Sequence, residues 1–461
     1  MKTATLLFIM TTALAAGSGP GFNLPAPQTF KLRNGMTVFY LQDRSLPLVG
    51  FRLLINSAGT AAEPESLEGA ADLMAELMMK GAAGKSALQV AEELDALGAI
   101  LQINAGDEFL SLSGQSLAKY WPELLSITCD CLLHPDFSEP EFVKEKERRI
   151  DRIKAIKDEP SQAVIHYFRK AYWEAHPFGR LAVGSEASLQ AMTVKDIRAF
   201  YRSAVRPDQA LLAVVGDLSS ADLKKELEKR VSMWRNSDAV APSTVLPALP
   251  LPRGKRGLLV DKPDASQAYF ILGAPGIAAV DQHAAAAQVM NTLFGGRFTS
   301  RLNNELRVKR GLTYGARSSL ESWRPGGLFT ISSYTRNEKI GEMLQVSLDL
   351  LRQTALQGFD EDEVVSGRNY VLGQFPPKFE TLMSKARAYT DLAFYGLPFD
   401  YYSGLLSRVG SSDREAIHVQ ARRLMPQENY VLVVVGKAEE IREQLAPFAV
   451  WEFRSIMKDG F

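Results

Sequence analysis

LLAVVGD, at residues 211–217, recurs as VLVVVGK at residues 431–437, and this pair decides the fold of the 461-residue chain. Each segment is a continuous apolar run that ends in a glycine and leads into a helical pattern, which is typical of a buried strand. The neighbouring elements recur in the same order, since QAYFILGAP (267–275) resembles VGFRLLINSAG (49–59). The sequence therefore predicts an internal duplication, with two α+β domains of about 210 residues each on one chain.

A proline-rich segment separates the two halves. NSDAVAPSTVLPALPLPRGKRG (236–257) contains four prolines and keeps neither a helical nor a strand period. We expect it to be a partly polyproline-like linker. It would join an N-terminal domain at 23–235 to a C-terminal domain at 258–461.

The N-terminus has the pattern of a secretory signal. MKTATLLFIMTTALAAGSG carries one lysine, an apolar run from Ala4 to Ala16 and an Ala13-Leu14-Ala15 triplet. We expect residues 1–16 to be a signal peptide cleaved near Ala15 or Ala16, which predicts an exported, periplasmic protein. A disordered or membrane-anchoring start is the alternative. No later run approaches the roughly 20 apolar residues of a membrane span, so none is expected.

Composition excludes several classes of partner and site. Lys+Arg and Asp+Glu both number 53, which gives no reason to expect nucleic acid as a partner. Cys129 and Cys131 lie two apart on an expected helix, where a mutual bridge would be strained, so we interpret them as buried thiols. The five histidines form no i, i+4 pair of the kind that binds zinc.

The stretch GAADLMAELMMKG (69–81) is the part of the sequence that bears most directly on function. Its apolar residues recur at i, i+3, i+4, i+7 and i+8, which predicts a helix with one buried face. The other face carries Asp72, Ala75 and Glu76.

This frame resembles the pitrilysin/insulinase (inverzincin) metallopeptidase family, and its mitochondrial-processing-peptidase-like branch in particular. The resemblance also rests on HPFGRLAVGSEASL (176–189), FGGRFTSRLNNELRVKRGLTYG (294–315) and the paired VVG strands, and it covers essentially all of the mature chain. It implies two homologous α+β domains, each a mostly antiparallel sheet packed with helices, arranged as a clamshell. Active members carry H-x-x-E-H, whose histidines bind zinc and whose glutamate activates water, and a further glutamate about 75 residues downstream completes the site.

All four of those positions differ in this chain. Gly69 and Lys80-Gly81 set the register, which places Asp72 and Glu76 where the family has its histidines and Ala75 where it has its general base. The downstream ligand position falls on Arg152, 76 residues beyond Glu76. Alanine cannot accept a proton and a guanidinium cannot ligate a cation, so the resemblance implies a chain that binds no metal and does not hydrolyse peptides by the family mechanism.

Three readings of the altered positions are open. We hypothesise that Arg152 forms an ion pair with Asp72 and Glu76 where zinc would lie, tying two helices together. The three side chains would otherwise be separately solvated. A hard cation such as Ca²⁺ on the two carboxylates is a further reading, which the nearby guanidinium disfavours.

The second half retains a different feature of the family. Arg307 and Tyr314 match an arginine and a tyrosine that contact substrate near the scissile bond in family members. A guanidinium offers a rigid fork of donors to peptide carbonyls, and a phenol can donate to a developing oxyanion. A surface arginine and a core tyrosine are the structural alternative. An expected edge strand at 99–105 resembles the one on which family members dock extended substrate.

Altered zinc positions beside a retained substrate-contact pair predict a non-catalytic, substrate-binding subunit of an exported heterodimeric zinc metallopeptidase. Its partner would be a zinc-motif-bearing paralogue, with zinc in that partner, and its ligand a peptide or unfolded polypeptide. A stand-alone peptide-binding or chaperone-like pseudopeptidase is the alternative. A purely structural role, like that of the processing-peptidase-like subunits of a respiratory complex, is disfavoured by the predicted signal peptide.

Overall fold

The computed structural model describes residues 24–243 and 245–458. The predicted signal peptide lies outside these residues. Within them, no helix is long and apolar enough to cross a membrane.

The N-terminal half is built on a six-stranded sheet of order β1-β2-β8-β3-β7-β6. Only the β2–β8 pairing is parallel, and the other four are antiparallel. The strands are β1 (Gln28–Lys31), β2 (Thr37–Gln42), β3 (Leu48–Asn56), β6 (Ile100–Ala105), β7 (Phe109–Leu117) and β8 (Ala210–Gly216), with a separate two-stranded ribbon of β4 (Gly81–Ala82) and β5 (Lys85–Ser86). The helices are α1 (Ala70–Leu77), α2 (Ala87–Ala96), α3 (Trp121–Leu133), α4 (Glu139–Asp158), α5 (Pro160–Trp173), α6 (Glu186–Ala191), α7 (Val194–Ala204) and α8 (Ser220–Val231).

The C-terminal half repeats this plan, with a sheet of order β11-β12-β10-β13-β9-β14. Its strands are β9 (Lys255–Asp261), β10 (Gln267–Pro275), β11 (Arg317–Ser322), β12 (Gly327–Arg336), β13 (Tyr430–Gly436) and β14 (Val450–Ser455). Its helices are α9 (Ala284–Asn291), α10 (Arg301–Asn303), α11 (Ile340–Gln357), α12 (Glu361–Gly373), α13 (Leu382–Tyr395), α14 (Tyr401–Ser411), α15 (Arg414–Leu424) and α16 (Ala438–Leu445). Two π-helical turns, Thr292–Gly296 and Asn304–Lys309, flank α10.

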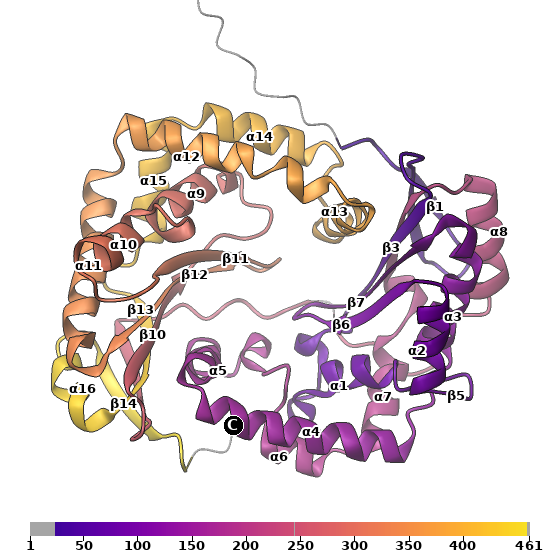
Figure 1. Cartoon of the computed structure of the whole chain (residues 1–461), viewed down its shortest axis with the longest axis horizontal. Helices are drawn as coiled ribbons and strands as arrows, with labels where there is room; N and C mark the ends of the chain where they lie inside the picture. The colour runs from indigo at the N-terminus through magenta and orange to yellow at the C-terminus, as the bar shows by residue number, and fades with distance from the viewer. Residues whose placement is uncertain (1–23, 244, 459–461) are drawn as a thin grey trace, which may run out of the picture.

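The two sheets confirm the predicted duplication. β8 and β13, the two VVG strands, occupy the same place in their sheets, as do β3 and β10. The outer strand beside β2 or β9 differs, because β1 comes from the start of the first half and β14 from the end of the second. Figure 1 shows the two halves facing each other as a clamshell, with α5 and α13 between them.

The VVG strands are continuously apolar because both of their faces are buried. Along β8, Leu212 and Val214 belong to the core of the N-terminal half, whereas Ala213 and Val215 pack into the core of the C-terminal half. Alternate residues of a strand point to opposite faces, so one strand serves two cores.

The halves exchange helices to cover these inner faces. α13 of the C-terminal half packs on β3 and β8, and α5 of the N-terminal half packs on β10 and β13. At each of these helix–sheet contacts the sheet has a glycine. A Cβ at Gly50 would lie 3.1 Å from the Cβ of Leu382 on α13, and a Cβ at Gly273 would overlap the ring of Phe168 on α5. The glycines therefore allow each foreign helix to approach its sheet closely.

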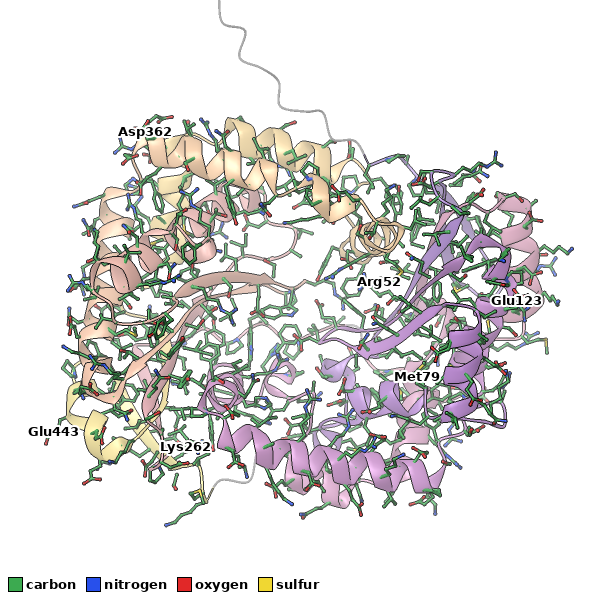
Figure 2. The ribbon with its side chains drawn as sticks, viewed as in Figure 1. Arg52, Met79, Glu123, Lys262, Asp362 and Glu443 are labelled. Atoms are coloured by element: carbon green, nitrogen blue, oxygen red, sulfur yellow. The ribbon has the colours of Figure 1, made fainter. Side chains whose placement is uncertain are left out.

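Charged contacts join the halves across the middle of the molecule. Arg52 of β3, labelled in Figure 2, is 7% exposed and donates to Thr390 and to the carboxylate of Asp391 on α13. At the tip of the β6–β7 hairpin, buried Glu108 accepts a hydrogen bond from Arg324 of the β11–β12 hairpin at 2.8 Å. The two halves are thus joined by an ion pair between the β6–β7 and β11–β12 hairpins as well as by the exchanged helices.

The proline-rich segment lies against the N-terminal half. Leu246 and Leu249 pack on the core of that half, and the carbonyl oxygen of Pro247 lies 3.2 Å from Nε2 of His176. β9 already begins at Lys255, inside the range expected to be linker. The segment is therefore a strap that is fixed at least along 246–249.

Candidate functional site

α1 carries two of the altered zinc positions on an accessible face. It begins after Gly69, whose φ of +94° favours glycine, and the buried carboxyl group of Glu63 accepts hydrogen bonds from the backbone N–H groups of Gly69 and Ala71. The side chains of Asp72 and Glu76 are 32% and 38% exposed. Ala75 is instead 1% exposed and part of the core, so it does not share the open face on which the sequence placed it. The packing of α4, α7 and β6 around α1 accounts for this burial.

Arg149 of α4, and not Arg152, forms the ion pair with both carboxylates. One terminal nitrogen donates to Oδ2 of Asp72 at 2.8 Å and the other to Oε2 of Glu76 at 3.0 Å, while the Arg149 side chain is only 6% exposed. The prediction of a guanidinium that bridges the two helices is correct in kind but wrong by one helical turn. Arg152 is exposed, on the neighbouring face of α4.

The sequence contained a signal for Arg149. The buried stripe of α4 runs through Phe142, Glu145, Arg149 and Ile153, with helical spacings of three and four. Phe142 and Ile153 alone define that stripe, and it passes through 149 but not 152. The family's spacing of about 75 residues from Glu76 pointed instead to Arg152, three positions after Arg149.

A second ion pair extends the first. Glu145, one turn before Arg149, is 2% exposed and accepts from Lys80 at 3.2 Å and from Arg148 at 2.8 Å. Burial is the largest single influence on the pKa of Glu145 and raises it, but the hydrogen bonds from Lys80 and with Glu76 and the charges of Lys80 and Arg148 together outweigh burial, so the net pKa is lowered. We call Asp72, Glu76, Lys80, Glu145 and Arg149 the α1–α4 ion cluster.

The ion cluster does not fit the zinc ion that the family implies. Asp72 and Glu76 already accept from a guanidinium, and the cation that binds them comes from the helix that would have to supply a third ligand. Ala75 has no group that could take a proton from water. Among the described residues no group of three or more His, Cys, Asp or Glu is placed to hold a metal.

A cavity of about 670 Å³ opens beside the ion cluster. Its wall includes Asp72, Arg152, His166 and Arg169. Burial, assisted by Arg169 and Arg152, lowers the pKa of His166 to about 4, so the imidazole is neutral at pH 7. The cavity thus combines acidic and basic groups with a neutral histidine. We call it the α4–α5 cavity.

The predicted substrate-contact residues lie in the C-terminal half. The Arg307 guanidinium stacks on the ring of Phe298, with its carbon 4.5 Å from the ring centre. Tyr314 is 81% exposed and Phe298 is 67% exposed, so this aromatic and basic surface is open to a ligand. The core-tyrosine alternative is therefore wrong.

One buried side chain ties the two loops of this surface together, and the sequence reading missed it. The amide of Asn303, 3% exposed, donates to the carbonyl oxygen of Phe298 at 2.6 Å and accepts from the backbone N–H of Ala316 at 3.3 Å. Asn303 precedes Arg307 by one helical turn. It therefore fixes the ring under Arg307 relative to the loop that presents Tyr314.

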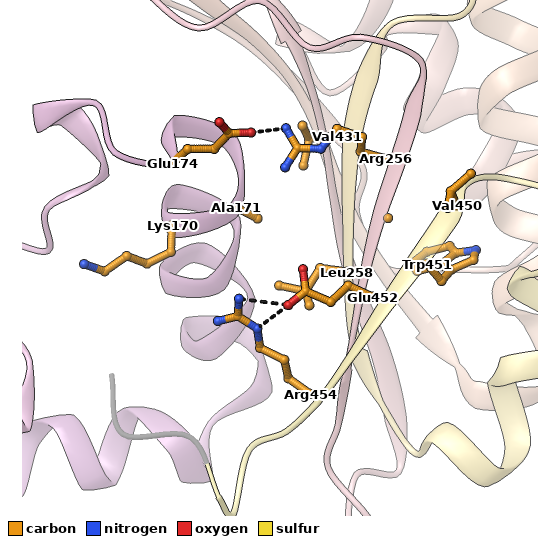
Figure 3. A pocket seen from close by; sticks show the side chains of 11 residues that line it. Lys170, Ala171, Glu174, Arg256, Leu258, Val431, Val450, Trp451, Glu452 and Arg454 are labelled. Atoms are coloured by element: carbon orange, nitrogen blue, oxygen red, sulfur yellow. Dashed lines mark hydrogen bonds and ion pairs between the residues drawn. The ribbon is translucent and has the colours of Figure 1, made fainter.

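A different cavity, of about 600 Å³, lies at the far end of α5 against β9 and β14 (Figure 3). Charged side chains in its wall are paired, Glu174 with Arg256 across the two halves and Glu452 with Arg454 along β14. Lys170 in its wall directly follows Arg169, which lines the α4–α5 cavity, so the two cavities meet neighbouring residues of α5. We interpret this place as a polar seam between the halves.

Comparisons with known proteins decide the family. The model of "Insulinase (Peptidase family M16)" matches residues 38–185, and that of "Peptidase M16 inactive domain" matches residues 191–371. The chain belongs to the M16 peptidase family. The word "inactive" describes the segment 191–371, which contains none of the altered zinc positions.

Relatives of the chain include bacterial proteins named as uncharacterized zinc proteases. An uncharacterized zinc protease of Streptomyces coelicolor is 28% identical over 313 residues, which are 66% of this chain and 67% of that protein. The uncharacterized zinc protease YmxG of Bacillus subtilis is 24% identical over 357 residues, which are 77% and 85% of the two chains.

Solved structures share the fold. A peptidase M16 inactive domain from Pseudomonas fluorescens superposes with a TM-score of 0.83 at 23% identity and covers 89% of this chain and 97% of its own. A protease from Helicobacter pylori also gives 0.83, at 17% identity, with 90% and 100% covered. The M16 clamshell of two α+β domains is thereby confirmed.

Proposed function

We propose that this chain is the non-catalytic, substrate-binding subunit of an exported heterodimeric zinc metallopeptidase. The proposal rests on one contrast within the molecule. Arg149 lies between Asp72 and Glu76, where the family resemblance implies zinc. Arg307 and Tyr314, in contrast, keep the chemistry of a peptide-contact pair, with Tyr314 exposed and Arg307 half-buried. In this proposal the zinc and the water-activating glutamate belong to a second M16 chain.

The chain's own residues would bind and orient the peptide. The Arg307 guanidinium donates to peptide carbonyls from a position held by the Phe298 ring. The Tyr314 hydroxyl donates to a carbonyl oxygen that gains negative charge as the partner attacks it. The ion cluster holds α1 and α4 together, in place of a metal shared by the two helices.

A peptidase assay combined with metal analysis tests the proposal. The purified chain should contain no stoichiometric zinc and cleave no peptide alone, and it should activate a co-expressed M16 chain with an intact H-x-x-E-H motif from the same genome. Arg307→Ala and Tyr314→Phe should abolish this activation, whereas Arg336→Ala, at an exposed arginine at the end of β12, should not. Zinc binding and cleavage by the chain alone would refute the proposal. Tight peptide binding with no activation of any M16 partner would favour the stand-alone peptide-binding alternative.

Export is tested separately. The proposal expects the mature chain in the periplasmic fraction, with its N-terminus just beyond Ala15 or Ala16. N-terminal sequencing of the fractionated protein would show this, and an uncleaved chain in the cytoplasmic fraction would contradict it.

A further inference from the structure

A smaller cavity, of about 240 Å³, lies between the start of α5 and the sheet of the C-terminal half. Val164 and Ile165 of α5 form one wall, and Tyr269 and Tyr334 form the opposite wall. These tyrosines are cross-strand partners on β10 and β12, and their rings stack 5.1 Å apart at 18°. The volume is of the size of one large side chain. We call it the tyrosine cavity.

The tyrosine cavity adjoins both parts of the candidate site. Ile165 borders it and also borders the α4–α5 cavity, so the two cavities share a wall. At its other side the wall is Gly315, the residue directly after Tyr314. A peptide held by Tyr314 and running toward the ion cluster would therefore pass over this opening.

The chemistry of the walls selects among side chains. Ile165 is 45% exposed, although it is a branched apolar residue on a helix, and it faces half-buried aromatic rings. Among the described residues, Arg317 is the only charged one in this wall, and its Nε donates to Ser332 at 3.3 Å at the rim. Aromatic rings favour ring stacking and apolar contact. A cationic side chain would lose water here and meet the like charge of Arg317, and an anionic one would have only this exposed guanidinium at the rim as a partner.

We propose that the tyrosine cavity binds one aromatic or large aliphatic side chain of an extended peptide and so determines which substrates the chain accepts. This inference rests on the proposed function, because it deepens the role of the Arg307 and Tyr314 surface. Burial of one such side chain corresponds to roughly a tenfold to hundredfold gain in affinity over alanine.

Fluorescence anisotropy with the full chain tests the inference. The probes are three fluorescein-labelled decapeptides of serine and glutamine that differ only at one central position, which is phenylalanine, alanine or glutamate. The phenylalanine peptide should bind at least about tenfold more tightly than the other two. Ser332→Phe, which fills the cavity, should remove this preference, and Ile165→Ala should reduce it. Val143→Ala, at an aliphatic residue of α4 with similar exposure, should leave it unchanged.

The outcomes separate the two proposals. Equal binding of the three peptides, or an unchanged preference in Ser332→Phe with a normal thermal unfolding curve, would overturn the tyrosine cavity while leaving the substrate-binding role intact. Loss of all three peptides in Arg307→Ala would support the underlying function. Failure of the chain to bind any peptide, alone or with its zinc-bearing partner, would refute both.

Discussion

The ion pair between α1 and α4 makes an asymmetric prediction about stability. The Arg149 side chain is 6% exposed, whereas those of Asp72 and Glu76 are 32% and 38% exposed. Its Nε is also buried without a hydrogen-bond partner among the described residues. Removal of the arginine leaves two carboxylates that water can reach. Removal of the carboxylates leaves a buried positive charge with no acceptor, which lowers the free energy of unfolding by more.

The magnitudes follow from burial. Arg149→Met keeps most of the apolar stem and loses two charge-assisted hydrogen bonds to part-exposed acceptors, for about 1–2 kcal/mol. Asp72→Ala combined with Glu76→Ala should lose about 3–5 kcal/mol, as expected when a buried charge loses its partners. The triple variant removes the stranded charge and should regain most of that loss, ending close to Arg149→Met alone.

Urea unfolding followed by tryptophan fluorescence measures these differences. With a slope of about 2–3 kcal/mol per molar, a loss of 3 kcal/mol moves the midpoint by about 1–1.5 M. The matched control is Lys154→Met, at an exposed lysine of α4 whose one ion pair among the described residues is with Asp151. It should move the midpoint by less than about 0.5 M. If the double carboxylate variant is no less stable than Arg149→Met, the buried guanidinium does not depend on these partners and the reasoning is refuted.

Three further results are expected. Asp72→His with Glu76→His and Arg149→Glu should create a chain that binds about one zinc per molecule by elemental analysis, because it restores three ligands on two adjacent helices. The free energy of unfolding should fall by about 2–3 kcal/mol as the pH drops from about 6.5 to about 4, because His166 stays neutral in the folded state while the unfolded chain takes up the proton; His166→Gln should flatten this part of the pH profile. Gly273→Ala should destabilise the chain by about 1–3 kcal/mol in thermal unfolding, since its Cβ would overlap the phenyl ring that α5 packs against β10.

Each of these has a contrary outcome. The histidine variant with glutamate at 152 in place of 149 should bind no zinc, and equal zinc in both versions would show that the position of Arg149 is not decisive. An unchanged pH profile in His166→Gln would assign the acid sensitivity to other groups. If Phe168→Leu does not restore Gly273→Ala, the clash on α5 is not the cause.

Much of the fold was predictable because its signals are local and repeated. The Asn34-Gly35 turn between β1 and β2 and the cap that Ser86 forms at α2 both follow from short patterns, and the structure contains both. The VVG runs predicted strands buried on both faces. They did not show that the second face of each sheet is covered by a helix from the other half. An apolar run indicates that a strand is buried, but not which element packs on it.

The candidate site was predictable in kind but not in register. Asp72 and Glu76 share an accessible helix face as their spacing indicates, but the arginine that joins them was misplaced by one turn, because loop lengths between α1 and α4 are not fixed by either helix. Asn303 and Phe298 were missed for another reason. Their roles depend on contacts between two loops that no periodicity describes.

Because α5 and α13 each cover the sheet of the other half, we expect neither half to fold stably without the other. Expressed alone, residues 24–235 would expose the apolar inner face of β3 and β8 that α13 covers, and residues 255–458 would expose that of β10 and β13. Such bare faces promote aggregation. A protease cut in the 236–254 strap should, by contrast, leave two fragments that stay associated and migrate together under native conditions. In this chain the linker joins the halves covalently, whereas the exchanged helices hold them together by packing.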